Sequence, residues 1–297
     1  MILSVVTPSY NQGEFIERTI QSVLSQNIPE LEYVIFDGGS SDNTIDVLKK
    51  YQNQLRWVSE KDGGQTNAVN KGLKATAGDI IGWLNSDDIY YPEAFNTVLD
   101  FFAKNIEIDI VYGQSNHIDK QDQFMDAYPT EIWDQNRLHQ TCFISQPAVF
   151  FRRTVIERFG LLDESMNYCM DYEYWLRLSL AGAKFAYIPK VLAATRLYAE
   201  TKTLGARVKV HSEINDMLKK KLGKVPDRWL SNYGHIIADS WGFPRYKELR
   251  FGTCMSLAAF YASLRWNHTI SISMLKMLGG FTKSSLRAFF SKKSRPS

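Results

Sequence analysis

The pattern of hydrophobic and polar positions over the first hundred residues alternates between short apolar runs and segments with helical spacing. Each apolar run predicts a buried strand, and the apolar residues that follow it recur every three or four positions, which predicts a helix. The predicted strands cover residues 2–7, 31–36, 55–59 and 80–84. Strands that alternate with helices in this way are typical of an α/β fold with a mostly parallel sheet and right-handed crossovers.

Each of these predicted strands ends in a polar loop. The loops contain Thr7–Asn11, Asp37–Asp42, Glu60–Asn67 and Asn85–Asp88. Because the carboxyl ends of parallel strands meet at one edge of a sheet, where α/β proteins bind ligands, four such loops predict a ligand site. The adjacent acids Asp87 and Asp88 suit a hard cation that bridges phosphate oxygens. The alternative is that Ser86 and these acids only cap the next helix.

The pattern continues to residue 203 with further elements of both kinds. It predicts a helix from Pro92, a strand at 108–112, a hairpin and a mobile segment within 116–137, a strand at 143–153, a helix after residue 168 and a strand at 184–188. Asp171 lies at the start of the predicted helix. A carboxylate there can be a catalytic group, or it can simply interact favourably with the helix dipole.

The last third of the chain differs in pattern and in charge. Residues 1–200 contain 17 Lys+Arg and 27 Asp+Glu, whereas residues 201–297 contain 18 and 5. The apolar spacing becomes helical throughout, as at Leu257, Phe260, Tyr261 and Leu264. We therefore expect two domains, residues 1–203 and a basic helical region at 204–297.

An apolar stripe flanked by cations is what an interfacial helix presents to anionic lipid, so the basic region predicts peripheral membrane contact. Aromatic and basic residues alternate to the C-terminus, at Phe281, Lys283, Leu286, Arg287, Phe289, Phe290, Lys292, Lys293 and Arg295. The alternative is that these helices pack on the first domain or on another subunit of a homo-oligomer. No nucleic-acid module is visible, so a nucleic-acid partner is not expected.

Composition limits the setting of the protein. With 44% hydrophobic residues in 297, the chain can bury a substantial core. No signal peptide and no apolar run long enough to span a bilayer are recognisable. Cys142, Cys169 and Cys254 are widely spaced, which favours a reducing cytoplasm over a disulfide framework or a zinc site.

Four motifs carry a resemblance to a known family. They are Thr7–Asn11, Asp37–Thr44, Asp62–Gly72 and Leu84–Asp88. In order and spacing they resemble the family 2 glycosyltransferases with the GT-A fold, and the resemblance covers about residues 1–203. It implies a nucleotide-sugar donor, with a UDP-sugar expected, and a divalent metal, Mn²⁺ or Mg²⁺.

The resemblance also implies roles for individual residues. Those implied at the nucleotide sugar are Thr7, Pro8 and Tyr10 beside the base and ribose, Asp37 on the base, Asn67 and Lys71 near the nucleotide, and Ser86, Asp87 and Asp88. Asp87 would bind the metal, with Asp88 near the metal or the sugar. Asn85 stands where many relatives have the first acid of Asp-x-Asp, and its amide oxygen would be a weaker ligand.

For the transfer step, the resemblance implies Asp171 as the general base. Met170 stands where relatives have Glu, and Tyr198 replaces the His of an Arg-x-His motif. Candidate acceptor or diphosphate contacts are Gln146, Glu173, Arg196 and Lys202. A solvated basic loop is the alternative for Arg196 and Lys202.

These observations together predict an inverting glycosyltransferase that transfers a sugar to a hydroxyl of a glycan, expected to be lipid-linked, in cell-surface polysaccharide synthesis. It would be cytoplasmic and peripheral at the inner face of the cell membrane. Two alternatives stay open: a non-catalytic nucleotide-sugar-binding protein and a sugar-phosphate nucleotidyltransferase. The second requires a glycine-rich loop with Arg after the first strand, and residues 7–14 contain only Gly13 and no Arg.

Overall fold

The computed structural model describes residues 1–199, 201, 205–243 and 248–280. The chain forms two compact units. Residues 1–135 and 142–199 make the first unit, and residues 136–141 belong with the chain from residue 200 onward in the second. The short segment 136–141 was expected in the first domain on sequence grounds.

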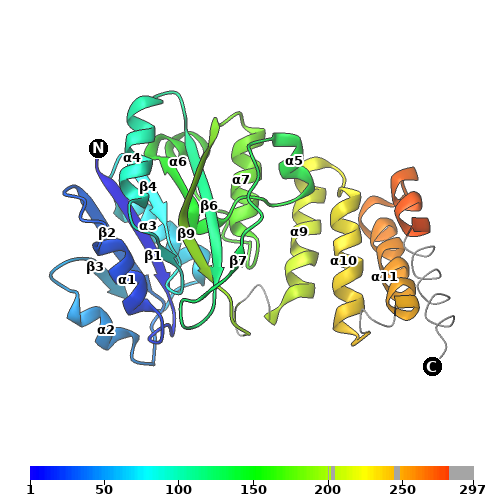
Figure 1. Ribbon diagram of the computed structural model, residues 1–297, viewed down its shortest axis with the longest axis horizontal. Coiled ribbons are helices and arrows are strands. Elements are labelled where there is room, and N and C mark those ends of the chain that lie inside the picture. Colours follow the sequence, from blue (N-terminus) through cyan, green and yellow to red (C-terminus); the bar gives the residue numbers. More distant parts are fainter. Residues whose placement is uncertain (200, 202–204, 244–247, 281–297) are drawn as a thin grey trace. The chain divides into compact units, whose positions relative to one another are not determined.

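The first unit is built on one mixed sheet with the strand order β3-β2-β1-β4-β8-β6-β9-β5, and β7 pairs with β6 (Figure 1). The strands are β1 Leu3–Ser9, β2 Leu31–Asp37, β3 Arg56–Ser59, β4 Ile80–Trp83, β5 Ile89–Tyr90, β6 Ile110–Ile118, β7 Phe124–Ala127, β8 Val149–Arg152 and β9 Phe185–Arg196. The four strands predicted first, β1 to β4, are mutually parallel. Strand β8 then runs antiparallel to β4 and β6, while β6 and β9 are parallel. The predicted α/β class is confirmed.

Helices follow the strands of the first unit. They are α1 Ile16–Leu24, α2 Thr44–Lys50, α3 Gln65–Ala75, α4 Ala94–Lys104, α6 Arg153–Phe159 and α7 Met170–Leu180, while α5 Gln135–Gln140 lies at the boundary with the second unit. All seven residues of β1 are buried, as expected for a strand covered on both faces.

Successive side chains of β1 serve opposite faces of the sheet. Leu3 and Val5 join the apolar core that contains the buried residues of α1 and α4. Val6 faces α3, where a Cβ added to Gly72 would come within 2.2 Å of its side chain. Glycine at position 72 therefore lets α3 lie close against β1, which brings the start of α3 next to the strand ends.

Two elements differ from their predicted extent. The strand expected at 143–153 begins as a short 3-10 helix, Gln146–Ala148, because Pro147 has no backbone N–H for a sheet. Strand β9 continues to Arg196, well beyond the predicted end at 188, and keeps pairing with β6 after shifts in register near Gly113 and Gln114. The extension carries Arg196 to the end of the β4 strand.

The second unit is helical, in agreement with the spacing of its apolar residues. It contains α9 Arg207–Leu222, α10 Asp227–Ser240, α11 Glu248–Ala262, a π-helical turn Ser263–Asn267, and a helical segment at 272–280. The Asn267 side chain exchanges two hydrogen bonds of 2.8 Å with the backbone of Val225, which fixes the π-helical turn to the loop before α10. Across the described ranges, no helix has the length and hydropathy needed to cross a bilayer. The aromatic and basic residues predicted at 281–295 lie outside the described residues.

Candidate active site

Asp37 lies at the end of β2 and organises the loop that follows it. Its Oδ2 accepts hydrogen bonds from the backbone N–H groups of Gly39 and Ser40 at 3.0 and 2.8 Å and from the Ser59 hydroxyl at 2.6 Å. Its Oδ1 accepts one from the Ser40 hydroxyl. Gly39 has φ +82°, a conformation that favours glycine. The Asp37 carboxylate is buried, and Oδ1 is the one of its two oxygens with fewer hydrogen bonds from the protein.

The end of β1 contributes side chains of two kinds. Thr7 and Pro8 are buried, and the Thr7 hydroxyl lies 3.2 Å from the Tyr33 hydroxyl. Tyr10, just beyond the strand, is 62% exposed. The Asn11 backbone N–H donates to the Ser40 hydroxyl at 2.7 Å, which connects this loop to the loop after β2. Of the three residues predicted at the base and ribose, Tyr10 presents its ring to solvent.

The first turns of α3 are connected to the loop that leads into α7. Asn67 and Asn70 both donate to the carboxylate of Glu164, at 3.0 and 2.9 Å, and these hydrogen bonds lower the pKa of Glu164. Lys71 forms a 2.6 Å ion pair with Glu60. Sequence reasoning missed Glu164 and Asn70. The signal was a polar Asn70 on the apolar side of α3, where it is buried.

Asn85 is the centre of a closed amide network at the end of β4. Its Oδ1 accepts hydrogen bonds from Trp83 Nε1 at 3.0 Å and Gln65 Nε2 at 2.9 Å. Its Nδ2 donates to Gln146 Oε1 at 2.9 Å and to Asp88 Oδ2 at 3.3 Å. Because an indole N–H can only donate, Trp83 fixes which way the Asn85 amide points. Both acceptor positions of its oxygen are thus already used by protein donors.

Gln146 is part of the same network. Its Nε2 donates to the Trp83 carbonyl at 2.6 Å while its Oε1 accepts from Asn85. Both ends of the side chain therefore hold β4 against the short 3-10 helix. The structure brings Gln146 to the predicted site, where it bonds to protein groups.

The two acids after β4 have different surroundings. Asp88 is buried, and its Oδ1 accepts a 3.0 Å hydrogen bond from the backbone N–H of Arg196. Burial and then the charge of Asp87 raise the pKa of Asp88 well above its ordinary value, and they outweigh the effect of Arg196. Asp87 is partly exposed, and its Oδ2 accepts a 2.9 Å hydrogen bond from the Tyr198 hydroxyl.

Arg196 is buried and bonded to protein groups. Its guanidinium donates to the Asp87 carbonyl and to the carboxylate of Asp122, and it lies 4.9 Å from the centre of the Phe15 ring. Tyr198 packs on the same ring with centroids 4.9 Å apart. Arg196 thus joins the Asp87 loop to the hairpin between β6 and β7, and Lys202 lies outside the described residues.

Asp171 is in the first turn of α7. Burial raises the pKa of its carboxyl to about 6, although the backbone N–H groups of Asp171 and Tyr172 act in the opposite direction. The side chain keeps some contact with solvent. Burial, and then the charge of neighbouring groups that include Asp171, raises the pKa of Tyr128 and of Cys142. Asp171 is therefore a carboxyl group poised to exchange a proton near neutral pH.

Glu173 has a structural environment. It is fully buried and pairs with Arg177, whose Nε lies 2.9 Å from Glu173 Oε1. The guanidinium of Arg177 also donates to the carbonyls of Phe159 and Leu161, both at 2.7 Å. This pair fixes α7 to the preceding loop.

The residues after β4 fit a divalent cation only in part. Within the described ranges, no group of three or more His, Cys, Asp or Glu side chains is placed to hold a metal. Asp87 and Asp88 nevertheless offer adjacent carboxyl groups, although burial, and then the charge of Asp87, raises the pKa of Asp88. Such a pair suits a cation whose other ligands come from a bound phosphate.

An α/β sheet with polar loops at one edge, an acidic pair after β4 and an acid on α7 is the arrangement expected of the GT-A fold. Similar solved structures support the fold. Staphylococcus aureus TarS 1–349 in complex with UDP-GlcNAc has a TM-score of 0.64 at 16% identity and covers 97% of this chain and 89% of that one. Mannosyltransferase PcManGT from Pyrobaculum calidifontis, in complex with GDP-Man and Mn²⁺, has a TM-score of 0.60 at 16% identity, with 96% and 80% covered.

The sequence identifies the family. The model of glycosyl transferase family 2 matches residues 4–160, and this chain belongs to that family. It is 31% identical over 209 residues to chondroitin synthase of Escherichia coli, covering 68% of this chain and 30% of that protein. It is 30% identical over 220 residues to hyaluronan synthase of Pasteurella multocida, covering 71% and 22%. The chain thus spans less than a third of these two relatives, and the resemblance to family 2 is confirmed.

Proposed function

We propose that this protein is an inverting glycosyltransferase that moves a hexosyl or N-acetylhexosaminyl group from a UDP-sugar to a hydroxyl of a glycan. The observation that carries the proposal is the Asp171 carboxyl, which has a pKa of about 6 in a chain of family 2. The relatives named as chondroitin and hyaluronan synthases support a role in polysaccharide synthesis. The TarS complex with UDP-GlcNAc supports the choice of donor.

Asp171 would act as the general base. Above pH 6 its carboxylate is ionised and can accept the proton of the acceptor hydroxyl as the oxygen attacks the anomeric carbon. The hydrogen bonds from the backbone N–H groups of the first turn of α7 hold the carboxylate in place during this transfer. A single displacement inverts the configuration at that carbon.

Asp87 and Asp88 would hold the divalent metal, Mn²⁺ or Mg²⁺, together with the donor diphosphate. When bound, the metal would neutralise charge that develops on the leaving diphosphate. Tyr198 would orient Asp87 through its 2.9 Å hydrogen bond. Asn85, predicted as a third ligand, would instead organise the strand end, because its oxygen already accepts two protein hydrogen bonds.

The nucleotide would lie along the loops after β1 and β2. Tyr10 would cover the base, and Asp37 would accept its N–H through Oδ1. Thr7 and Pro8 would border the base and ribose, whereas Asn67, Lys71 and Ser86 would border the diphosphate and ribose. Arg196 and Gln146 would hold the surrounding loops in place and would not contact the ligand, since both bond to protein groups.

We further propose that the acceptor is a lipid-linked glycan at the cytoplasmic face of the cell membrane, and that the basic helical region makes a peripheral membrane contact. The support is the excess of cations in residues 201–297, with 18 Lys+Arg against 5 Asp+Glu. Residues 1–203 would then carry the transfer chemistry, and residues 204–297 would carry the contact with the membrane.

A donor screen tests the proposal. Thermal unfolding is measured with UDP- and GDP-sugars, each with and without Mn²⁺, because a ligand that binds the native state raises its stability. The donor that binds is then offered to a panel of glycan acceptors, and release of nucleoside diphosphate is followed. We expect a UDP-sugar to stabilise the protein more strongly with Mn²⁺ and to be turned over.

Two results would contradict the proposal. Donor binding without turnover across the acceptor panel would favour a non-catalytic nucleotide-sugar-binding protein. Pyrophosphate release from a nucleoside triphosphate and a sugar phosphate would favour a nucleotidyltransferase. Asp171→Asn is the matched control, since it should bind the donor as the wild type does and fail to transfer it.

A further inference from the structure

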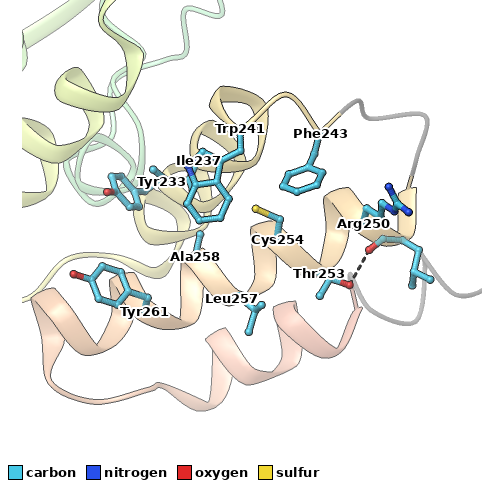
Figure 2. Close-up of a pocket in the computed structure, with 11 residues that line it drawn as sticks. Tyr233, Ile237, Trp241, Phe243, Arg250, Thr253, Cys254, Leu257, Ala258 and Tyr261 are labelled. Atoms are coloured by element: carbon cyan, nitrogen blue, oxygen red, sulfur yellow. Dashed lines mark hydrogen bonds between the residues drawn. The ribbon is translucent and has the colours of Figure 1, made fainter.

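The second unit contains an apolar pocket of about 740 Å³ between α10 and α11 (Figure 2). The residues that line it are mostly aromatic or aliphatic and include Tyr233, Trp241, Phe243, Leu257 and Tyr261. All of them come from residues 233–261, so the pocket is formed within this unit. Pockets of this size and character hold small apolar ligands or parts of larger ones.

The pocket opens onto an exposed apolar surface. Trp241 is 68% exposed, Leu257 65% and Tyr261 58%, although all three line the pocket. The stripe predicted from the sequence, which adds Phe260 and Leu264, lies at the surface of α11 and of the π-helical turn that follows it. Large apolar side chains gathered on a surface mark a site of interaction with a protein or a membrane.

Positive charge dominates the sequence that follows the first residue of α11. Residues 249–297 contain no Asp and no Glu, but they contain eight cations: Arg250, Arg265, Lys276, Lys283, Arg287, Lys292, Lys293 and Arg295. Arg250 also lines the pocket, at the opposite end of the row of lining residues from Tyr261 (Figure 2). Eleven residues of α-helix separate them, a length of about 16 Å. A pocket that is apolar along its length and cationic at one end matches an acyl chain with an anionic head group.

We propose that the pocket and the exposed face of α11 bind phospholipid of an anionic bilayer. One acyl chain of the lipid enters the pocket, and the phosphate of the same lipid contacts Arg250. Trp241, Leu257 and Tyr261 insert into the bilayer interface around this lipid. The cations in the described part of residues 249–297, Arg250, Arg265 and Lys276, favour an anionic bilayer over a second copy of this chain, because two copies would bring like charges together. This inference deepens the proposed membrane contact, and it concerns a unit separate from the transfer chemistry.

Vesicle flotation of the full-length protein tests the surface. Binding is compared between phosphatidylcholine vesicles and vesicles in which about a third of the lipid is phosphatidylglycerol, because anionic lipid gives the surface a negative potential. We expect binding to the anionic vesicles only. Leu257→Asp should weaken it about tenfold, because burial of one leucine side chain is worth at least that factor. Ile106→Asp is the matched control, since Ile106 is 81% exposed in the first unit.

Fluorescence tests the pocket itself. Anionic vesicles with brominated acyl chains quench a tryptophan that contacts the chains. We expect quenching of the wild type and loss of most of it in Trp241→Phe, which leaves the other six of the seven tryptophans in place. Arg250→Gln should weaken binding to anionic vesicles.

Three outcomes would overturn the inference. In the first, Leu257→Asp binds as tightly as the wild type while Lys292→Glu with Lys293→Glu abolishes binding, so the C-terminal cations act alone. In the second, the protein self-associates without lipid and Leu257→Asp prevents it, so the surface joins two copies. In the third, brominated lipid quenches Trp241→Phe as strongly as the wild type, so Trp241 does not contact the acyl chains. Donor turnover with a soluble acceptor, measured without vesicles, reports separately on the proposed transfer reaction.

Discussion

Replacing Asp171 by Asn should remove transfer activity and at the same time stabilise the folded protein at neutral pH. The two effects have one origin. Burial raises the pKa of the Asp171 carboxyl from 3.8 to about 6, which keeps the group close to the pH at which a general base works best. The same burial makes its ionised form unfavourable in the folded state.

The magnitude follows from linkage. Because the folded-state pKa lies above the unfolded one, the contribution of this group to stability is complete below pH 3.8 and is lost as the pH rises through about 6. Asparagine stays neutral throughout. The free energy of unfolding of Asp171→Asn should therefore exceed that of the wild type by about 1 kcal/mol at pH 4.5 and by about 3 kcal/mol at pH 7.5. These are upper limits, since the side chain retains some solvent contact.

Urea unfolding of both proteins at the two pH values measures the difference in free energy. In parallel, the transfer rate of the wild type should rise tenfold per pH unit up to about pH 6 and then level off. The rate of Asp171→Asn should be lower by about 10³-fold at pH 7.5, with donor affinity unchanged. Equal stabilities at pH 7.5 would show that Asp171 is solvated, and a wild-type rate in the variant would remove it from the mechanism.

Three further substitutions probe the surroundings of the acids. Asn85→Asp should destabilise the protein by about 2 kcal/mol, because a carboxylate would face Gln146 Oε1 in place of the amide donor, and it should not tighten Mn²⁺ binding. Urea unfolding measures the stability and Mn²⁺ titration the affinity, and tighter Mn²⁺ binding would refute this prediction. Tyr198→Phe should weaken Mn²⁺ binding in the presence of UDP by severalfold, since Asp87 loses an orienting hydrogen bond. Calorimetry measures this affinity, and an unchanged value would contradict the prediction. Arg177→Met should lower the free energy of unfolding by about 3 kcal/mol, because a fully buried carboxylate loses its partner; a loss below 1 kcal/mol would contradict that.

The edge of the sheet could be predicted from the sequence because it depends on local patterns. Short apolar runs fix β1, β2 and β4, and a polar loop directly after a parallel strand has to lie at their common edge. Asp37 and Asp87 were found by this rule alone.

The contacts of the side chains at that edge could not be predicted. The network of Asn85 depends on donors from β4 and α3 and on an acceptor from the 3-10 helix, which lie up to 61 residues from Asn85 in the chain. Arg196 was expected in a loop, because the register shifts that let β9 continue to pair with β6 leave no mark on hydrophobic periodicity. The raised pKa of Asp171 likewise depends on burial, which sequence spacing does not report.

The connection between α3 and the loop before α7 has a mechanical consequence. Thr66 donates to the Met166 carbonyl at 3.1 Å, and Asn70 exchanges hydrogen bonds of 3.0 and 3.1 Å with the backbone of Leu162. Together with the bonds to Glu164, these bonds fix the first turns of α3 to the loop before α7. A shift of α3 would therefore be transmitted to the loop before α7, and through that loop to the position of Asp171 in the first turn of α7.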